Sequence, residues 1–138
     1  MAQKNQKIKT AGAISAEVWE TIKQGSDQRF QDPVTAIALL AAREAVDMAG
    51  LPKDNLGPRF GSVIGSGMGG AATIDTNYWK FLHDNRARLD GMAVPKLMAN
   101  AGASWVAMEF GINGPTYCLS TACSSASQSI GLAKALIQ

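Results

Sequence analysis

The chain has 138 residues and a mass of 14.5 kDa, so it holds at most one domain or part of one. Hydrophobic residues at 46% and charged residues at 17% exclude a disordered chain. A net charge of +2, with a basic cluster only at Lys4, Lys7 and Lys9, argues against nucleic-acid binding. The apolar run Ala36–Ala42 is shorter than the ~18 residues of a membrane span. The N-terminus lacks the apolar stretch of a signal peptide, so we expect a soluble cytoplasmic protein.

Residues 1–31 are expected to form a tail and one short helix. The first ten residues are polar and basic and show no apolar period. Ser15, followed by an apolar pattern that includes Trp19 and Ile22, predicts a short helix that ends at Gly25.

A strong helix signal begins at Asp32, which has the side chain of an N-cap and precedes Pro33 at the first helical position. Gly50 marks the end of this helix. Apolar residues recur at helical spacing and predict burial around most of the circumference. They are Ile37, Leu40, Ala41, Ala45 and Met48.

A buried strand is predicted at Phe60–Ile64, followed by a glycine turn at Gly65–Gly70 and a helix over Ala71–Leu89. The turn has the Gly-x-Gly-x-x-Gly pattern of dinucleotide-binding folds. That alternative also needs a second strand followed by an acid, whereas Asp84 and Asp90 lie in a polar segment. A structural glycine turn is the favoured interpretation.

Three further elements are predicted after this point: a helix over Lys96–Phe110 that Gly111 closes, a strand over Thr116–Ala122, and a helix over Ser124–Gln138. The last helix is expected to pack through Ala126, Ile130, Ala133 and Ile137. It reaches Gln138 without a stop signal, so we expect a longer natural protein. The alternation of helices and strands predicts an α/β layered fold with a central, mainly parallel sheet.

Cys123 is the candidate catalytic residue, because it lies between a predicted strand and the N-terminus of a predicted helix. Unpaired N–H groups and the helix dipole favour a thiolate there. Its flanking residues are small, as a sharp strand-to-helix nucleophile turn requires, and its own N–H could stabilise an oxyanion. A free cysteine is also often a buried apolar residue, and the pattern alone leaves both interpretations open. Cys118, on the strand, is expected to belong to the core, and the two cysteines lack the spacing of a zinc site, so we expect no metal.

The segment Gly114–Ala126, with the run Thr-Ala-Cys-Ser-Ser, resembles the active-site segment of β-ketoacyl-acyl carrier protein synthases. Three more blocks resemble that family in order and spacing: Asp32–Leu51, Val63–Gly70 and Val94–Gly111. The resemblance implies a thiolase-like layered fold, of which residues 32–138 would form a truncated N-terminal half-domain.

The resemblance also implies a reaction and its partners. An acyl group would pass from a carrier-protein thioester to Cys123 and then condense, with decarboxylation, with malonyl-acyl carrier protein in fatty acid or polyketide synthesis. Met68 would line the acyl pocket, and Arg86 and Arg88 would lie where the acidic acyl carrier protein docks. The implied assembly is a homodimer, or a pairing with a C-terminal half on another chain. No cofactor is implied.

The condensing enzymes of this family use two histidines and a lysine from their second half. Here the only histidine is His83, which falls where the family has no catalytic residue and is expected at the surface or in packing. An alternative to a working synthase is therefore a non-catalytic remnant or fragment that retains the fold.

Overall fold

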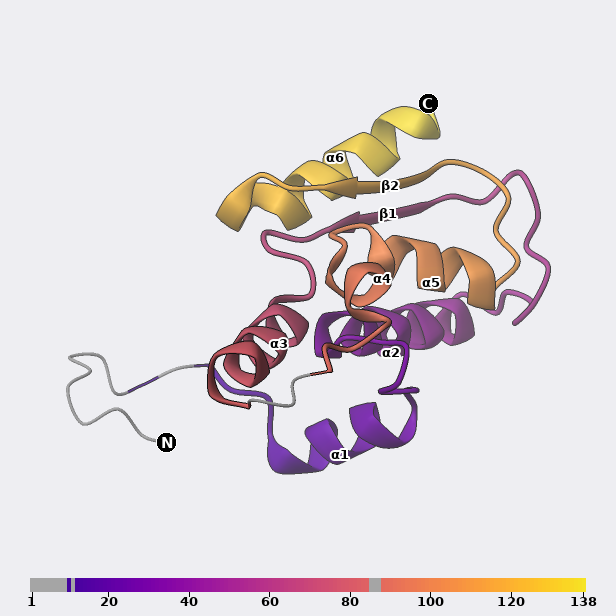
Figure 1. The fold of residues 1–138 in the computed structure, drawn as a ribbon. Coiled ribbons are helices and arrows are strands. Elements are labelled where there is room, and N and C mark those ends of the chain that lie inside the picture. Colours follow the sequence, from indigo (N-terminus) through magenta and orange to yellow (C-terminus); the bar gives the residue numbers. More distant parts are fainter. Residues whose placement is uncertain (1–9, 11, 85–87) are drawn as a thin grey trace.

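The computed structural model describes residues 10, 12–84 and 88–138, and the N-terminal lysine cluster lies outside them. One two-stranded sheet is surrounded by helices (Figure 1). The elements in chain order are α1 (Ala16–Gln24), α2 (Pro33–Met48), β1 (Ser62–Gly65), α3 (Ala71–His83), α4 (Ala93–Leu97), α5 (Ala101–Glu109), β2 (Thr116–Leu119), the 3₁₀ turn η1 (Ala122–Ser124) and α6 (Ser125–Leu136).

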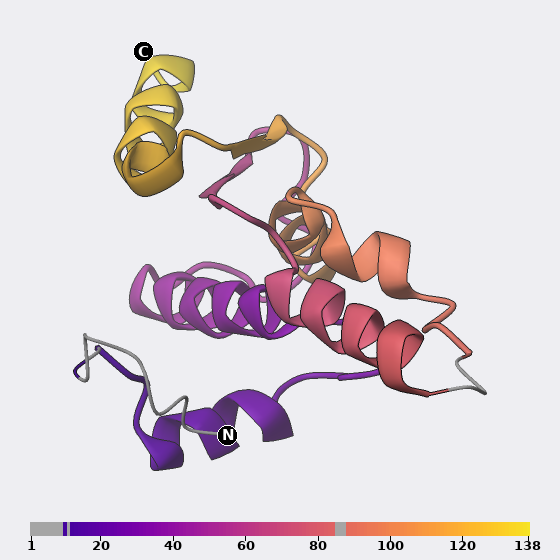
Figure 2. The same cartoon turned by 60° about the vertical axis from the view of Figure 1, so that its left-hand side comes forward.

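The sheet pairs β1 with β2 in parallel, with Ser62 opposite Thr116 and Gly65 opposite Leu119. Helix α6 covers one face, while α5 lies against the other face with α2 behind it (Figures 1 and 2). Parallel strands with helices on both faces form an α/β layered arrangement, as predicted.

The hydrophobic core lies between α2, α5 and the sheet. Its buried members are Leu39, Val106 and Phe110, with Ile64 and Trp105 packed against them. The prediction that α2 is buried around most of its circumference is wrong. Its buried residues are Thr35, Ala36 and Leu39, whereas Ile37, Ala41, Ala45 and Met48 are exposed. The reason is that α5 covers only one side of α2.

A single helix over Lys96–Phe110 is also wrong, because α4 ends at Leu97 and α5 begins at Ala101. The break has a clear cause. The Leu97 carbonyl accepts a hydrogen bond from the Gly70 N–H at 3.1 Å, so the glycine turn uses an acceptor that a continuous helix would need. A side chain on Gly69 would lie 2.7 Å from the same carbonyl oxygen.

Helix α6 packs through small polar residues rather than through its predicted apolar face. Ser125 and Ser129 are buried, whereas Ala126 is exposed, and Ile130 and Ile137 are 72% and 87% exposed. This face is chosen by Gly65, where a side chain would collide with the Ser125 carbonyl. The helix therefore approaches the strand closely where both residues are small.

Helix ends are the best predicted local features. Ser15 caps α1 through the Val18 N–H, and Asp32 caps α2 through the Val34 N–H at 3.0 Å. Asp32 is also 2% exposed, and its second oxygen accepts hydrogen bonds from the Thr73 N–H at 2.8 Å and the Thr73 hydroxyl at 2.6 Å. One carboxylate therefore ties the start of α2 to the first turn of α3.

Candidate active site

Strand β2 leads directly into a sharp turn that carries Cys123. The strand ends at Leu119, and η1 and α6 follow after two residues. Ala122, the residue before the cysteine, has φ +50°, a left-handed conformation that costs an L-residue about 1–2 kcal/mol. Strain of this kind gathers at functional sites. Cys123 itself is exposed, so the alternative of a buried apolar cysteine is wrong.

Hydroxyl groups hold this turn in place. The buried Ser125 Oγ accepts a hydrogen bond from the Thr121 N–H at 3.0 Å and donates one to the Ala122 carbonyl at 2.7 Å. The Ser124 Oγ donates to the Thr121 carbonyl at 2.7 Å. The strained residue is therefore fixed from both sides, and the cysteine after it has a defined direction.

The Cys123 N–H lies at the N-terminal end of η1 and α6, and no described residue accepts a hydrogen bond from it. An exposed sulfur beside an unpaired backbone donor at a helix N-terminus suits nucleophilic attack on a carbonyl, because the donor can bind the oxyanion that forms.

The glycine turn after β1 lies beside the cysteine turn. A side chain on Gly67 would lie 3.8 Å from the Ala122 Cα, and the Ser120 Oγ donates to the Gly67 carbonyl at 3.4 Å. Met68 projects from this turn and is 76% exposed. The structure thus brings together the turn of Met68 and the turn of Cys123, which are separated by more than fifty residues of sequence.

The dinucleotide-binding alternative does not fit the structure. It requires a strand followed by an acid after the glycine turn, yet residues 71–84 and 88–115 contain no strand.

In the described part of the chain, no group of three His, Cys, Asp or Glu side chains could hold a metal ion. The helices in the described residues are also too short or too polar to cross a membrane.

The sequence profile of the β-ketoacyl synthase N-terminal domain matches residues 2–138. The chain belongs to this family. Nodulation protein E of Rhizobium sp. (strain N33) is 37% identical over 127 residues, which cover 88% of the chain and 31% of that protein. A 3-oxoacyl-[acyl-carrier-protein] synthase 2 of Staphylococcus aureus (strain N315) is 34% identical over 113 residues, 81% of the chain and 27% of that enzyme. The chain therefore spans less than a third of these relatives.

A solved structure shows the same fold. The ishigamide ketosynthase/chain length factor superposes with a TM-score of 0.68 at 24% identity, over 82% of the chain and 29% of that chain. The predicted architecture, the N-terminal half of a thiolase-like layered fold, is confirmed.

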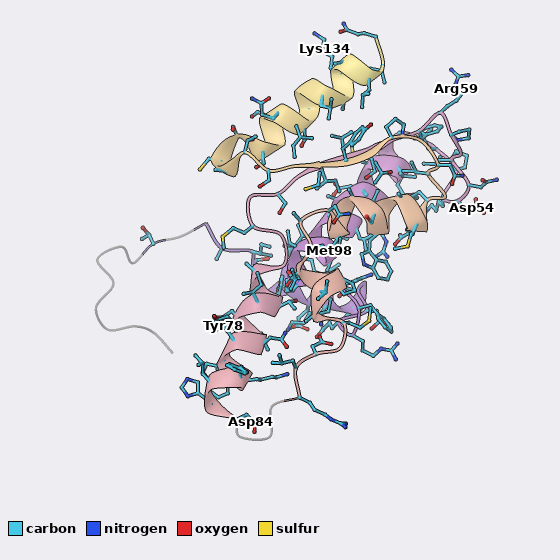
Figure 3. The ribbon with its side chains drawn as sticks, turned by 45° about the horizontal axis from the view of Figure 1, so that its top comes forward. Asp54, Arg59, Tyr78, Asp84, Met98 and Lys134 are labelled. Atoms are coloured by element: carbon cyan, nitrogen blue, oxygen red, sulfur yellow. The ribbon has the colours of Figure 1, made fainter. Side chains whose placement is uncertain are left out.

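Arg88 and His83 lie apart from the cysteine turn (Figure 3). Arg88 is exposed beyond the end of α3, and Arg86 lies outside the described residues. His83 is exposed with its ring 5.1 Å from that of Trp79, as expected for a histidine at the surface or in packing. The end of α3, marked by Asp84 in Figure 3, lies away from α6.

Cys118 is half-buried on β2, and its thiol donates to the Ala99 carbonyl at 3.1 Å. This agrees with the predicted structural role. The bracing by Thr121 and Ser125 and the tie between Asp32 and Thr73 were not foreseen. The sequence does contain a signal for the bracing of the cysteine turn, because serine side chains beside a turn often form hydrogen bonds with the local backbone. No local pattern links Asp32 to a residue in another helix.

Proposed function

We propose that this chain carries the acyl-accepting half of a β-ketoacyl-acyl carrier protein synthase, with Cys123 as the nucleophile. The observation that supports it best is an exposed cysteine on a strained, hydroxyl-braced turn at the start of α6. Membership of the synthase family points to the same residue, because the segment around it is the one that resembles the family's active site.

The proposed step begins when the Cys123 thiolate attacks the carbonyl carbon of an acyl thioester. The new C–S bond forms, and the carbonyl π electrons move to oxygen, where the Cys123 N–H stabilises the negative charge. The oxyanion then collapses, the bond to the carrier sulfur breaks, and the carrier leaves as a thiolate that takes up a proton. An S-acyl cysteine and a free carrier thiol remain.

The second step, decarboxylative condensation with malonyl-acyl carrier protein, needs groups that stabilise an enolate. His83 is the only histidine and lies on the exposed end of α3. We therefore assign condensation to a site completed by a C-terminal half on this or another polypeptide. If Cys123 accepts no acyl group, the alternative of a non-catalytic remnant is the correct one.

The same proposal assigns residues that contact the acyl chain and residues that contact the acyl carrier protein. Met68 lies on the turn beside Cys123 and is exposed, so its side chain can meet the acyl chain of a thioester bound there. Arg88 is exposed and offers a cation to an acidic acyl carrier protein, and Arg86 is assigned the same role.

Acylation is tested by incubating the chain with a long-chain acyl thioester and assigning the adduct by mass spectrometry. We expect an acyl group on Cys123, none on Cys118, and complete loss of the adduct in Cys123→Ser. The matched control, Cys118→Ser, should keep it. Preferential labelling of Cys118, by the thioester or by iodoacetamide across pH, would contradict the assignment of the nucleophile.

The condensation step is tested by adding malonyl-acyl carrier protein to the acylated chain. Each missing acid–base group typically removes 10²–10⁴-fold of the rate, so turnover should be near background. Substantial 3-oxoacyl product from the purified 138-residue chain would show that its own residues carry out condensation.

We propose that two copies of the chain associate through strand β2. Among the described residues, β2 pairs only with β1, so its other edge is free, and Tyr117 on it is 47% exposed. A free strand edge is a template for a further strand, and the segment 116–122 is the proposed seam between two copies. Sedimentation velocity should show a dimer or larger species. A stable monomer at all concentrations would contradict the seam.

A further inference from the structure

A cavity lies on the side of the molecule away from α6. It has a volume of about 270 Å³, is open to solvent on one side, and is lined by α1, the start of α2, α3 and α4. Helix α1 lies beside α2 and α3 at the opposite end of the layered arrangement from α6 (Figures 1 and 2). No role in the acyl transfer at Cys123 involves this cavity.

The inner wall of the cavity is apolar. Ile22 and Ala36 line it and are 4% and 6% exposed, and the half-buried Trp19 indole forms part of the same wall. A hydrocarbon or aromatic group placed here would lose its contact with water, which is favourable by about 25 cal/mol per Å².

Three lysines line the same cavity, and only Lys80 among them lacks a close ion pair in the described part of the chain. Lys23 pairs with Glu20 at 2.6 Å, and Lys96 pairs with Asp90 at 2.8 Å. The hydrogen bond from Lys96, with smaller contributions that include the charge of Lys80, holds the pKa of the Asp90 carboxyl below its usual value, so this carboxylate stays charged at neutral pH. Within the described residues, the Lys80 ammonium has no hydrogen bond or ion pair.

The neutral polar groups around the cavity are largely engaged with the protein. The Asn77 side chain donates to the Thr73 carbonyl at 2.8 Å and accepts from the Asp90 N–H at 2.9 Å. The Gln31 Oε1 accepts from the Asp27 N–H at 3.1 Å. A ligand here would therefore find an apolar wall and three lysines against the two carboxylates of Glu20 and Asp90, with Lys80 held only by longer-range attraction to Asp90.

We propose that this cavity binds a small amphipathic monoanion, such as a medium-chain carboxylate. Its charged group would pair with Lys80, and its apolar body would lie against Trp19, Ile22 and Ala36. The modest volume favours a small ligand, because pockets for drug-sized molecules begin at about 300 Å³.

The test is a titration of the full chain with octanoate, followed by ¹H–¹⁵N NMR at the Trp19 indole. We expect saturable shifts at Trp19, with no comparable change at the Trp105 indole on α5. Octanol and octylammonium have the same chain without the negative charge and should bind more weakly. The variant Cys123→Ala should bind octanoate unchanged, which separates this site from the acyl-transfer site.

Two variants locate the site. Lys80→Gln should weaken octanoate binding about threefold to fivefold, the effect of a partly exposed ion pair. Thr76→Leu should abolish saturable binding, because Thr76 is an exposed residue of α3 that lines the cavity and a larger side chain would fill it. The matched control is Arg59→Gln, which removes a charge at the opposite end of the molecule from Tyr78 of α3 (Figure 3).

The proposal is overturned if Trp19 shows no saturable shift, or if octanol binds as tightly as octanoate. It is equally overturned if Arg59→Gln weakens binding as much as Lys80→Gln, since the effect would then reflect net charge alone. Threefold to fivefold weaker octanoate binding in Lys80→Gln and loss of saturable binding in Thr76→Leu, with Arg59→Gln unchanged, support it.

Discussion

Two connections leave the carboxyl ends of adjacent parallel strands and enter helices, yet they are built differently. After β1, residues 66–70 lead to α3, and the positive φ of +60° falls on Gly69. After β2, residues 120–124 lead to α6, and the positive φ of +50° falls on Ala122. Glycine adopts this conformation freely, whereas alanine must be held in it.

The two connections are also held from different places. The glycine connection has one local bond, from the Gly69 N–H to the Ser66 Oγ at 2.9 Å. It depends further on distant residues, since Gly70 donates to the Leu97 carbonyl and Asp32 binds Thr73.

The cysteine connection is held by its own neighbours, above all Ser125. The cysteine connection is held chiefly by bonds within four residues, with one distant bond from the Ser120 hydroxyl to the Gly67 carbonyl, whereas the glycine connection also needs α2, α3 and α4 to be packed. The following predictions test this difference.

The largest expected effect concerns the contact between β1 and α6. Gly65→Ala should lower the free energy of unfolding by about 3 kcal/mol, because the new methyl group would collide with the Ser125 backbone. Urea unfolding measures it. The matched control, Gly67→Ala, places its methyl at ordinary contact distance from Ala122 and should change stability by less than about 0.5 kcal/mol. Equal effects of the two variants would refute the close approach of α6.

Asp32→Ala should lower the free energy of unfolding by about 2 kcal/mol. It removes the α2 cap, worth about 1 kcal/mol, and leaves the buried N–H and hydroxyl of Thr73 without an acceptor. Thermal unfolding measures the change. Ser15→Ala removes only the exposed cap of α1 and serves as the control, with a smaller expected loss. If the two losses are the same, Asp32 acts as a cap alone.

Ser125→Ala should lower the free energy of unfolding by about 1.5 kcal/mol, because the Thr121 N–H and the Ala122 carbonyl both lose their partner. It should also slow iodoacetamide alkylation of Cys123 several-fold under native conditions, since the turn loses its fixed direction. Ser127→Ala, at an exposed position on α6, is the control. A stability loss with unchanged Cys123 reactivity would show that the brace does not orient the sulfur.

Ala122→Gly should raise the free energy of unfolding by about 0.5–1 kcal/mol, because glycine adopts a φ of +50° without strain and part of that gain is offset by its greater freedom when unfolded. Chemical denaturation measures the difference. Ala126→Gly, in the first turn of α6, should instead be destabilising by about the same amount. Destabilisation at both positions would mean that Ala122 is not strained.

The smallest expected effect depends on pH. The pKa of Asp90 is lowered chiefly by the hydrogen bond from Lys96 and then by the Met92 N–H. The carboxylate therefore stabilises the folded chain at pH values above its pKa in the unfolded chain, about 3.8. This stabilisation is lost as the pH falls through the folded pKa. The difference in Tm between the natural chain and Lys96→Gln should therefore shrink below about pH 4. Lys53→Gln, at the exposed pair with Asp47, serves as the control. A difference in Tm that is constant down to pH 2 would contradict the coupling.

Local patterns predicted the elements that depend on neighbouring residues. The caps at Ser15 and Asp32, the stop at Gly50 and the strand before the glycine turn follow from side-chain chemistry within a few positions. The identity of the candidate nucleophile also came from its local segment. The inward faces of α2 and α6 were predicted wrongly, because apolar periodicity does not say which neighbour a helix meets.

The sequence by itself determined where the chain turns, which helix ends are capped and that Cys123 follows a strand, because these depend on contacts within about four residues. Only the tertiary structure decided that α6 approaches β1 through Ser125, that the predicted helix over residues 96–110 breaks in two, and that Asp32 reaches Thr73. Each of these joins residues more than twenty-five positions apart. Such contacts depend on how close two backbones can come, which small residues permit but do not specify.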